Sequence, residues 1–340
     1  MIEDLSETEE QRAFAAAASR GFETCAGLPA GEILRLVVGD GFLGLLAPEA
    51  TGGLGLGLRA ALPVARAAGR HLLVFPLVEA MIATGFAARH APELATRLLS
   101  GEGFATVAWA GRVHVAGDRA QGVAALAPCA GAASWLAFRA LRDGCETAAM
   151  VDLRHPGVEI IPSGALDTDR ATADVMLRDV AVAVIAESEW RPLADAGVVL
   201  RAADMIGAAD ASFADACAHV SIRRQFGKPL SALQVVATTL ARDHFALTGA
   251  ALSVEYAALA ADGAFEDAGI ARDVACSVAQ DASVTAAENA IQLHGALGFT
   301  AAMKLHRRLR RIQSAADIHG AKAARASLAD ALLESWKDAA

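Results

Sequence analysis

The sequence predicts a mainly helical protein with a small β-domain in its middle. The chain is 54% hydrophobic, only 5% aromatic and rich in alanine, the strongest intrinsic helix former. Apolar residues recur every three or four positions in the N-terminal and C-terminal parts, whereas short β-prone runs separated by Gly, Asp and Pro lie between them. We therefore expect an N-terminal helical domain over 1–103, an antiparallel β-domain over 104–190 and a C-terminal four-helix bundle over 191–340.

Within the N-terminal domain, helices are expected at 58–69 and 78–90, after a glycine-rich loop at 41–55. The β-domain is expected to contain strands at 105–109, 112–116, 147–153 and 158–161. Four long helical stripes follow, and their apolar faces can be buried only against one another. Asp210 and Asp243 lie on these stripes. A structural partner or exposure at the stripe margin is favoured over catalysis for both of them.

Composition and charge exclude several classes of protein. The net charge is −9 and no basic patch with interleaved aromatics is present, so we expect no nucleic-acid partner. No uncharged apolar run is long enough to cross a membrane, and the acidic N-terminus lacks a signal-peptide pattern. The five cysteines are scattered without CxxC pairs or a histidine at the spacing of a metal ligand, so neither a disulfide framework nor a metal site is expected. We expect a cytoplasmic protein.

Two C-terminal segments carry the chemistry. The first is 223–230, RRQFGKPL, at the end of a long predicted helix, and it is followed by Gln234. The second is 290–300, AIQLHGALGFT, followed by the arginine-rich 305–311, LHRRLRR. An arginine at a helix end can donate two hydrogen bonds to a pyrophosphate, and a neighbouring glycine lets the backbone approach a nucleotide.

Together these segments resemble the C-terminal bundle signature of the acyl-CoA dehydrogenases. Segments 46–55, 158–162, 166–170 and 179–182 are similar to that family's N-terminal loop and β-domain, so the resemblance spans nearly the whole chain. It implies an FAD cofactor whose site two subunits share. Arg223 would meet the pyrophosphate, and Gln225 and Phe226 would line the same cofactor. Gln292 and Gly295 would come from the neighbouring subunit. The alternative is that Arg223 and Gln292 only cap helices.

The resemblance implies a reaction for which this chain lacks the family's catalytic glutamate. The family removes an α-proton with a glutamate, whose usual positions correspond here to His319 and, in a smaller group, to Gly197. A buried core histidine is favoured over a displaced base for His319, and helical geometry turns Asp204 and Asp317 away from the base positions. Where the family presents a Thr or Ser to the flavin, segment 127–130 has Pro128 and Cys129.

Two further groups of residues have a structural interpretation. A hydrogen-bonding role is favoured for His294, which lies in the motif turn. A solvated helix face is favoured over contact with CoA phosphates for four arginines of the arginine-rich segment. These are Arg307, Arg308, Arg310 and Arg311.

The chain therefore resembles the shorter subunit of a heteromeric acyl-CoA dehydrogenase, an FAD-dependent oxidoreductase that desaturates acyl-CoA thioesters. The implied partners are the acyl-CoA substrate, a related dehydrogenase chain and an electron-transfer flavoprotein. By analogy with bacterial pairs, fatty-acid or sterol side-chain β-oxidation is expected. Two alternatives stay open. One is an active homo-oligomer that uses a displaced base such as His319. The other is a flavin-free scaffold that stabilises a related chain.

Overall fold

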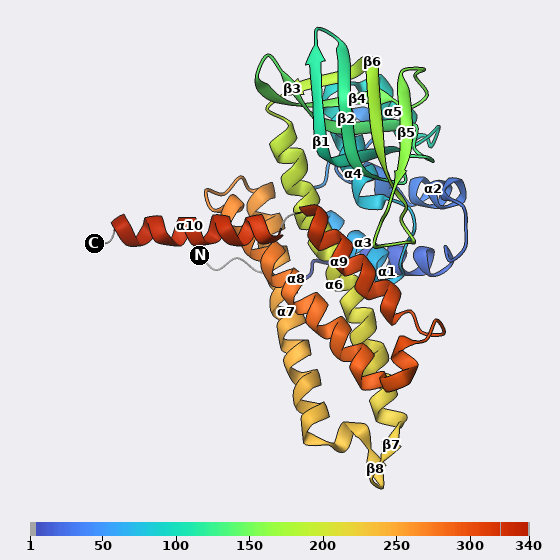
Figure 1. The fold of residues 1–340 in the computed structure, drawn as a ribbon, viewed down its shortest axis with the longest axis vertical. Helices are drawn as coiled ribbons and strands as arrows, with labels where there is room; N and C mark the ends of the chain where they lie inside the picture. Colours follow the sequence, from blue (N-terminus) through green and yellow to red (C-terminus); the bar gives the residue numbers. More distant parts are fainter. Residues whose placement is uncertain (1–4, 320, 339–340) are drawn as a thin grey trace.

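The computed structural model describes residues 5–319 and 321–338, with the side chains of 317–323 and 334–338 outside the description. Helices come first, strands follow, and long helices complete the chain, so the predicted mainly helical fold with a middle β-domain is confirmed (Figure 1). The β-domain lies at one end of the molecule, and the long helix α6 (Trp190–Ile222) runs from it to the opposite end.

The N-terminal domain is built from five helices among the described residues. They are α1 (Glu9–Glu23), α2 (Ala30–Gly39), α3 (Leu58–Arg70), α4 (Leu77–His90) and α5 (Pro92–Leu99). The predictions at 58–69 and 78–90 match α3 and α4. A capping box formed by Thr8 and Gln11 sets the start of α1. Helix α4 is buried on all sides over most of its length, which is why its apolar run is nearly continuous.

The β-domain is a small closed sheet. Its strands are β1 (Ala105–Ala116), β2 (Arg119–Pro128), β3 (Trp135–Arg142), β4 (Cys145–Asp152), β5 (Val158–Ser163) and β6 (Thr172–Glu187). They pair in the order β2-β1-β3-β4-β6-β5, and an additional β2–β6 pairing closes the ring. Side chains alternate between two cores. Ala108 and Phe138 point into the ring, whereas Val107 and Ala137 pack against the helices.

Strand β1 departs from the expected antiparallel arrangement. It pairs in parallel with β3, and the register shifts between Ala108 and Val113. The expected strands at 105–109 and 112–116 are therefore one strand interrupted by a bulge. Gly111, at φ +109°, supplies the backbone conformation that the bulge needs. The bulge matters because Trp109 begins it.

The C-terminal part is the expected bundle with an additional helix. After α6 come the short hairpin strands β7 (Arg224–Gln225) and β8 (Lys228–Pro229), then α7 (Gln234–Asp262), α8 (Ala268–His294), α9 (Leu305–His319) and α10 (Ala321–Asp338). Helix α6 packs against α8, α9 and α3. Helix α10 extends sideways from the body (Figure 1).

Both stripe aspartates have structural partners. Arg66 of the neighbouring helix α3 donates to Asp210 from Nε, at 2.8 Å, and from a terminal nitrogen. Asn289 donates to Asp243 at 2.8 Å, and burial raises the pKa of Asp243. The structural interpretation of these residues is confirmed.

Helices α3 and α6 cross at a reciprocal pair of glycines. A Cβ on Gly69 would collide with the carbonyl oxygen of Asp204, and one on Gly207 would collide with that of Arg66. Each glycine therefore admits the other helix's backbone, and the crossing fixes the N-terminal domain on the bundle.

We predict that Gly207→Ala lowers the free energy of unfolding by at least about 1–3 kcal/mol, because the added methyl group overpacks the crossing. Gly249→Ala, in exposed α7 with nothing within 4 Å of the new Cβ, is the matched control. It should stabilise the protein by about 1 kcal/mol through helix propensity. Urea unfolding of both variants checks the contrast, and equal effects would contradict the close crossing.

Candidate functional site

Arg223 ends helix α6 at the end of the bundle remote from the β-domain (Figure 1). The residue is exposed and adopts an extended backbone conformation, with φ −66° and ψ 125°. Its backbone N–H closes the helix on His219. Its guanidinium has no hydrogen bond or ion pair within the described part of the chain. Arg223 is therefore a free bidentate donor at a helix end.

The turn after Arg223 is strained. Phe226 and Gly227 have φ +52° and +76°, and they connect β7 to β8 as the two central residues of a tight hairpin. This left-handed conformation suits Asn or Gly and is costly for phenylalanine. Phe226 is nevertheless 87% exposed, and Gln225 beside it is exposed as well. Strain combined with an exposed aromatic ring is typical of residues kept for a contact outside the chain.

Gln292 and Gly295 lie at the same end of the bundle. His294 stacks on His219 with ring centroids 4.4 Å apart, which brings the C-terminal ends of α8 and α6 together. Gly295 has φ +60° and ψ −139°, a conformation open to glycine and costly for other residues. Both Gln292 and Gly295 are exposed. One chain thus presents both sequence motifs on one surface.

His294 has the structural role predicted for it. Its Nδ1 lies 2.7 Å from the Ala290 carbonyl, one turn back in α8. Burial, then His294 and Arg223, lower the pKa of His219. The lowered pKa favours the neutral form of His219 at pH 7.

Large apolar side chains surround these motifs. We call the following set, together with Arg223, the bundle-end surface: Ile222 (81% exposed), Phe226 (87%), Val235 (72%) and Phe299 (75%). Monomeric proteins rarely leave so many large apolar side chains exposed together. The bundle-end surface therefore has the character of a contact surface.

The first candidate base position, Gly197, lies near the other end of α6 and is covered by an aromatic ring. A Cβ on Gly197 would collide with the six-membered ring of Trp109. The indole Nε1 of Trp109 donates to Glu79 Oε1 at 3.1 Å, and Trp190 packs at 6.4 Å between ring centroids. No side chain could project from position 197 without displacing Trp109.

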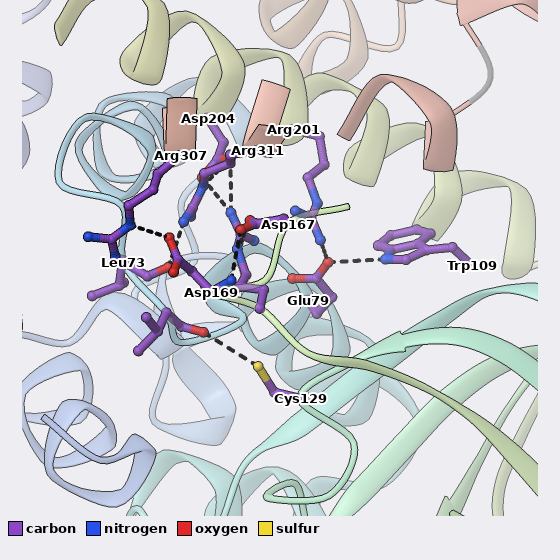
Figure 2. A network of polar contacts seen from close by, with 12 residues as sticks. Leu73, Glu79, Trp109, Cys129, Asp167, Asp169, Arg201, Asp204, Arg307 and Arg311 are labelled. Atoms are coloured by element: carbon purple, nitrogen blue, oxygen red, sulfur yellow. Dashed lines mark hydrogen bonds and ion pairs between the residues drawn. The ribbon is translucent and has the colours of Figure 1, made fainter. Parts of the chain in front are cut away.

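Glu79 and Arg201 form a buried ion pair next to Trp109 (Figure 2). Glu79 is 0% exposed and Arg201 is 4% exposed. Burial lowers the pKa of Arg201 to about 10, which leaves the guanidinium charged at neutral pH. The pair neutralises both charges in a place where either one alone would be costly.

Asp204, one turn further along α6, is the centre of a second buried group. Arg170 donates to both of its oxygens at 3.0 Å, and Arg311 donates to them at 3.0 and 2.9 Å. Arg311 also donates to the Leu73 carbonyl at 2.8 Å (Figure 2). Burial alone would raise the pKa of Asp204, but the two guanidinium groups outweigh it and hold that pKa well below its usual range. Asp204 is a structural counter-ion.

The solvated face predicted for the arginine-rich segment is wrong for two of its members. Arg311 is 1% exposed, and Arg308 is 7% exposed and pairs with Asp215. Arg307 pairs with Asp169 of the β5–β6 connection at 2.8 Å. The segment begins α9, which packs between the bundle and the β-domain, so its arginines meet carboxylates of other elements.

The second candidate base position lies in α9. His319 ends α9, but its side chain and that of Asp317 lie outside the described residues, as does Gly320. At the strand end expected beside a flavin, Cys129 has φ +55° and its thiol donates to the Val74 carbonyl at 3.4 Å. Burial raises the pKa of this thiol, so it is protonated at neutral pH.

Sequence reasoning missed Trp109, Glu79 and Arg201. Two signals were available. A glutamate interrupts the apolar run of α4, and an arginine interrupts the apolar first half of α6. Buried charges of this kind require partners. Their pairing with each other depends on how α4 and α6 pack.

Comparison with known proteins gives the class. Residues 196–332 match the family described as acyl-CoA dehydrogenase, C-terminal domain. The chain is 30% identical over 279 residues to acyl-CoA dehydrogenase FadE34 of Mycobacterium tuberculosis, a match that covers 81% of this chain and 38% of that protein. The chain thus spans less than half the length of this relative. Residues 196–332 therefore belong to the acyl-CoA dehydrogenase family, and 81% of the chain aligns with a member of it.

Solved structures have the same fold. The Tcur3481-Tcur3483 steroid ACAD, solved as a variant, matches with a TM-score of 0.88 at 23% identity, covering 97% of this chain and 99% of that one. The ChsE4-ChsE5 complex from Mycobacterium tuberculosis matches with a TM-score of 0.87 at 21% identity, covering 98% and 99%. No helix among the described residues is long and apolar enough to cross a membrane.

We predict that Asp204→Asn destabilises the protein by about 3–5 kcal/mol, because it leaves Arg170 and Arg311 buried without their carboxylate. Asp210→Asn is the control. Its partner Arg66 has a side chain that is 42% exposed, so the loss should be below about 1 kcal/mol. Chemical unfolding monitored by circular dichroism measures both, and equal losses would contradict the assignment.

The same carboxylate predicts an acid-dependent loss of stability. Since the folded pKa of Asp204 lies below the unfolded value of about 3.9, its contribution is complete above that value and is lost as the pH falls below it. The melting temperature of the wild type should therefore fall more steeply below about pH 4 than that of Asp204→Asn. Parallel curves for the two proteins would count against the prediction.

Proposed function

We propose that this chain is a subunit of an FAD-dependent acyl-CoA dehydrogenase that lacks the catalytic glutamate and completes its site with a related chain. The free guanidinium of Arg223 on the bundle-end surface is the observation that carries this proposal. It is exposed, unpaired within the described residues and surrounded by apolar side chains. A dinucleotide pyrophosphate and a second polypeptide would satisfy both features.

The geometry of α6 supports a shared site. Gly197 lies near the start of this helix and Arg223 at its end, so at 1.5 Å per residue they are about 39 Å apart along it. An extended flavin dinucleotide is far shorter than this. A cofactor held by Arg223 would therefore have its reacting end in the partner chain. Gln292 and Gly295 lie at the same end of the bundle as Arg223, where the neighbouring subunit's copy of them would meet a cofactor held between two subunits.

The residues fit the nucleotide half of FAD better than the flavin half. Arg223, Gln225 and the turn at Gly295 offer donors and close backbone approach at one end of the bundle. Cys129, with its thiol turned to Val74, occupies the strand end where the family presents a hydroxyl. When bound, FAD supplies the acceptor for the hydride that leaves the substrate's β-carbon. This chain's share would be to hold the nucleotide and exclude water from it.

The missing base also supports a partner. Removal of an α-proton from a thioester needs a carboxylate held near the operating pH. Gly197 offers no side chain, and the other position is His319. The related chain would supply the glutamate. More than half of the FadE34 sequence lies outside the match, enough for a second unit of this size.

The substrate class and redox partner follow from the family. We propose a CoA thioester as substrate and an electron-transfer flavoprotein as electron acceptor. Two of the matched structures are named as a steroid ACAD and as a two-component complex, which favours a bulky acyl group and a heteromeric assembly. The cytoplasmic location expected from the sequence stays a prediction.

A flavin-free scaffold is the second candidate. The observation that favours it is the position of the Trp109 ring over Gly197. The ring fills the space beside the first candidate base position of this chain. Flavin content separates the two functions. Chain co-purified with its related dehydrogenase should be yellow if the bundle-end surface holds FAD. A scaffold would add no flavin to the amount that the partner binds alone.

We predict that Arg223→Ala lowers the FAD content of the assembly at least tenfold, because a bidentate charge-assisted contact worth about 1.5–3 kcal/mol is removed. Arg35→Ala, an exposed arginine on α2, is the charge-matched control and should change nothing. Flavin absorbance per chain is the measurement, with circular dichroism to verify the helices. Unchanged FAD occupancy in Arg223→Ala would contradict the assignment of Arg223 to the pyrophosphate.

Phe226→Asn should separate folding from function. Asparagine tolerates the left-handed conformation, so the variant should be as stable as the wild type or up to about 1 kcal/mol more stable. It should also lose partner or FAD binding, because the exposed ring is gone. Melting temperature and size-exclusion chromatography with the partner measure the two effects. A variant that is destabilised and still assembles normally would show that Phe226 serves only the fold.

A further inference from the structure

Trp109 lies over Gly197 at the point where the β1 bulge begins. Along β1, Ala105, Val107 and Trp109 face the helices, whereas Ala108 faces the interior of the sheet. The regular alternation of the strand therefore places Trp109 toward Gly197. The parallel pairing with β3 is interrupted between Ala108 and Val113, directly after this position. The side chain placed there is an indole, the largest that a protein can insert.

Two charged groups hold the indole in place. Trp109 donates to Glu79, and Glu79 is in turn ion-paired with Arg201 of α6 (Figure 2). Both charged residues are more than nine-tenths buried. A carboxylate that accepts from an indole and a guanidinium fixes the orientation of both donors. Rotation of Trp109 out of its place would break its hydrogen bond to the buried Glu79 carboxylate and leave that carboxylate to Arg201 alone.

The ring also takes space that no other group fills. The Cβ direction of Gly197 points into the six-membered ring of Trp109, and the ring centroid of Trp190 lies 6.4 Å from that of Trp109. Glu79 lies beside the indole on the side of Arg201 (Figure 2). A group could take the place along the Cβ direction of Gly197 only by displacing Trp109.

We propose that Trp109 is a built-in plug. Held by Glu79 and Arg201, it occupies the place beside Gly197 that an acyl thioester would need, so that this chain's own centre stays closed and acyl-CoA reacts only at the partner's centre. The inference rests on the proposed function for the meaning of position 197. It adds a specificity-determining residue to the assembly, one that excludes substrate from one of two related centres.

The contact is tested without any cofactor or partner. Gly197→Ala should lower the melting temperature by several degrees, because its methyl group meets the indole. In a Trp109→Ala background the same substitution should cost nothing further, which a double-mutant cycle reveals. Trp135→Ala is the matched background, because this tryptophan of β3 contacts Arg97 and is not among the atoms that a Cβ on Gly197 would meet. Equal losses in all backgrounds would overturn the contact.

The closed centre is tested by ligand stoichiometry. Octanoyl-CoA, used as the probe, is titrated calorimetrically into the chain alone and into the assembly with its related dehydrogenase. The wild-type chain alone should bind none, and Trp109→Ala should bind one molecule per chain. Trp109→Leu is the second variant and is used if Trp109→Ala folds poorly. Leucine retains an apolar contact but is smaller than the indole. Binding of one octanoyl-CoA by the wild-type chain, or none by either folded variant, would overturn the plug.

The two proposals fail in different ways. If no flavin joins the assembly through Arg223, the proposed function falls, yet the stability cycle and octanoyl-CoA binding to the single chain still report on Trp109. If flavin binds normally and the wild-type chain also takes octanoyl-CoA, the proposed function stands and the plug falls.

Discussion

The buried carboxylate of Asp204 is the interaction on which the arrangement of the three parts depends. It lies on α6 and receives Arg170 from the β5–β6 connection and Arg311 from α9. Arg311 also reaches the backbone of Leu73 in the N-terminal domain. One charge thus ties the β-domain, the bundle and the N-terminal domain to a single point. Buried ion pairs contribute more to a defined arrangement of the chain than to net stability. This one lies where the three domains meet and fixes their relative positions.

Helix α6 transmits that arrangement over the whole molecule. Its first half carries Gly197, Arg201 and Asp204 in the centre, and its last residues lead to Arg223 and the hairpin. The glycine crossing with α3 and the packing on α8 keep it fixed along its length. The charges of the centre are buried and paired, whereas the far end is exposed, apolar and carries a cation without a partner among the described residues. The two ends of one helix therefore serve different purposes.

Most of the fold could be predicted because it follows from local pattern. The periodicity of 58–69 and 78–90 predicted α3 and α4 nearly to the residue. The bundle could be predicted because the apolar faces of its long helices can be buried only against one another. The partners of Asp210 and Asp243 followed from the rule that buried charges are paired. The β-domain was expected to be antiparallel, but strand pairing depends on contacts between distant segments, and the β1–β3 pair proved parallel.

The centre was less predictable for the same reason. Arg308 and Arg311 look like part of a solvated face because charge alone says nothing about which carboxylates a helix will meet once packed. Trp109, Glu79 and Arg201 come from three elements that approach only in the folded chain. The candidate cofactor residues were accessible from sequence because they lie close together in two short motifs. Their shared location still required the stacking of His219 on His294.

The apolar bundle-end surface affects how much of the chain accumulates in a cell. Without a partner, the chain would expose Ile222, Phe226, Val235 and Phe299 to water. Such exposure favours aggregation and degradation by quality-control proteases. The amount of partner synthesised together with this chain would then determine the steady-state amount of the chain. Its abundance would be governed by supply of a companion more than by its own folding.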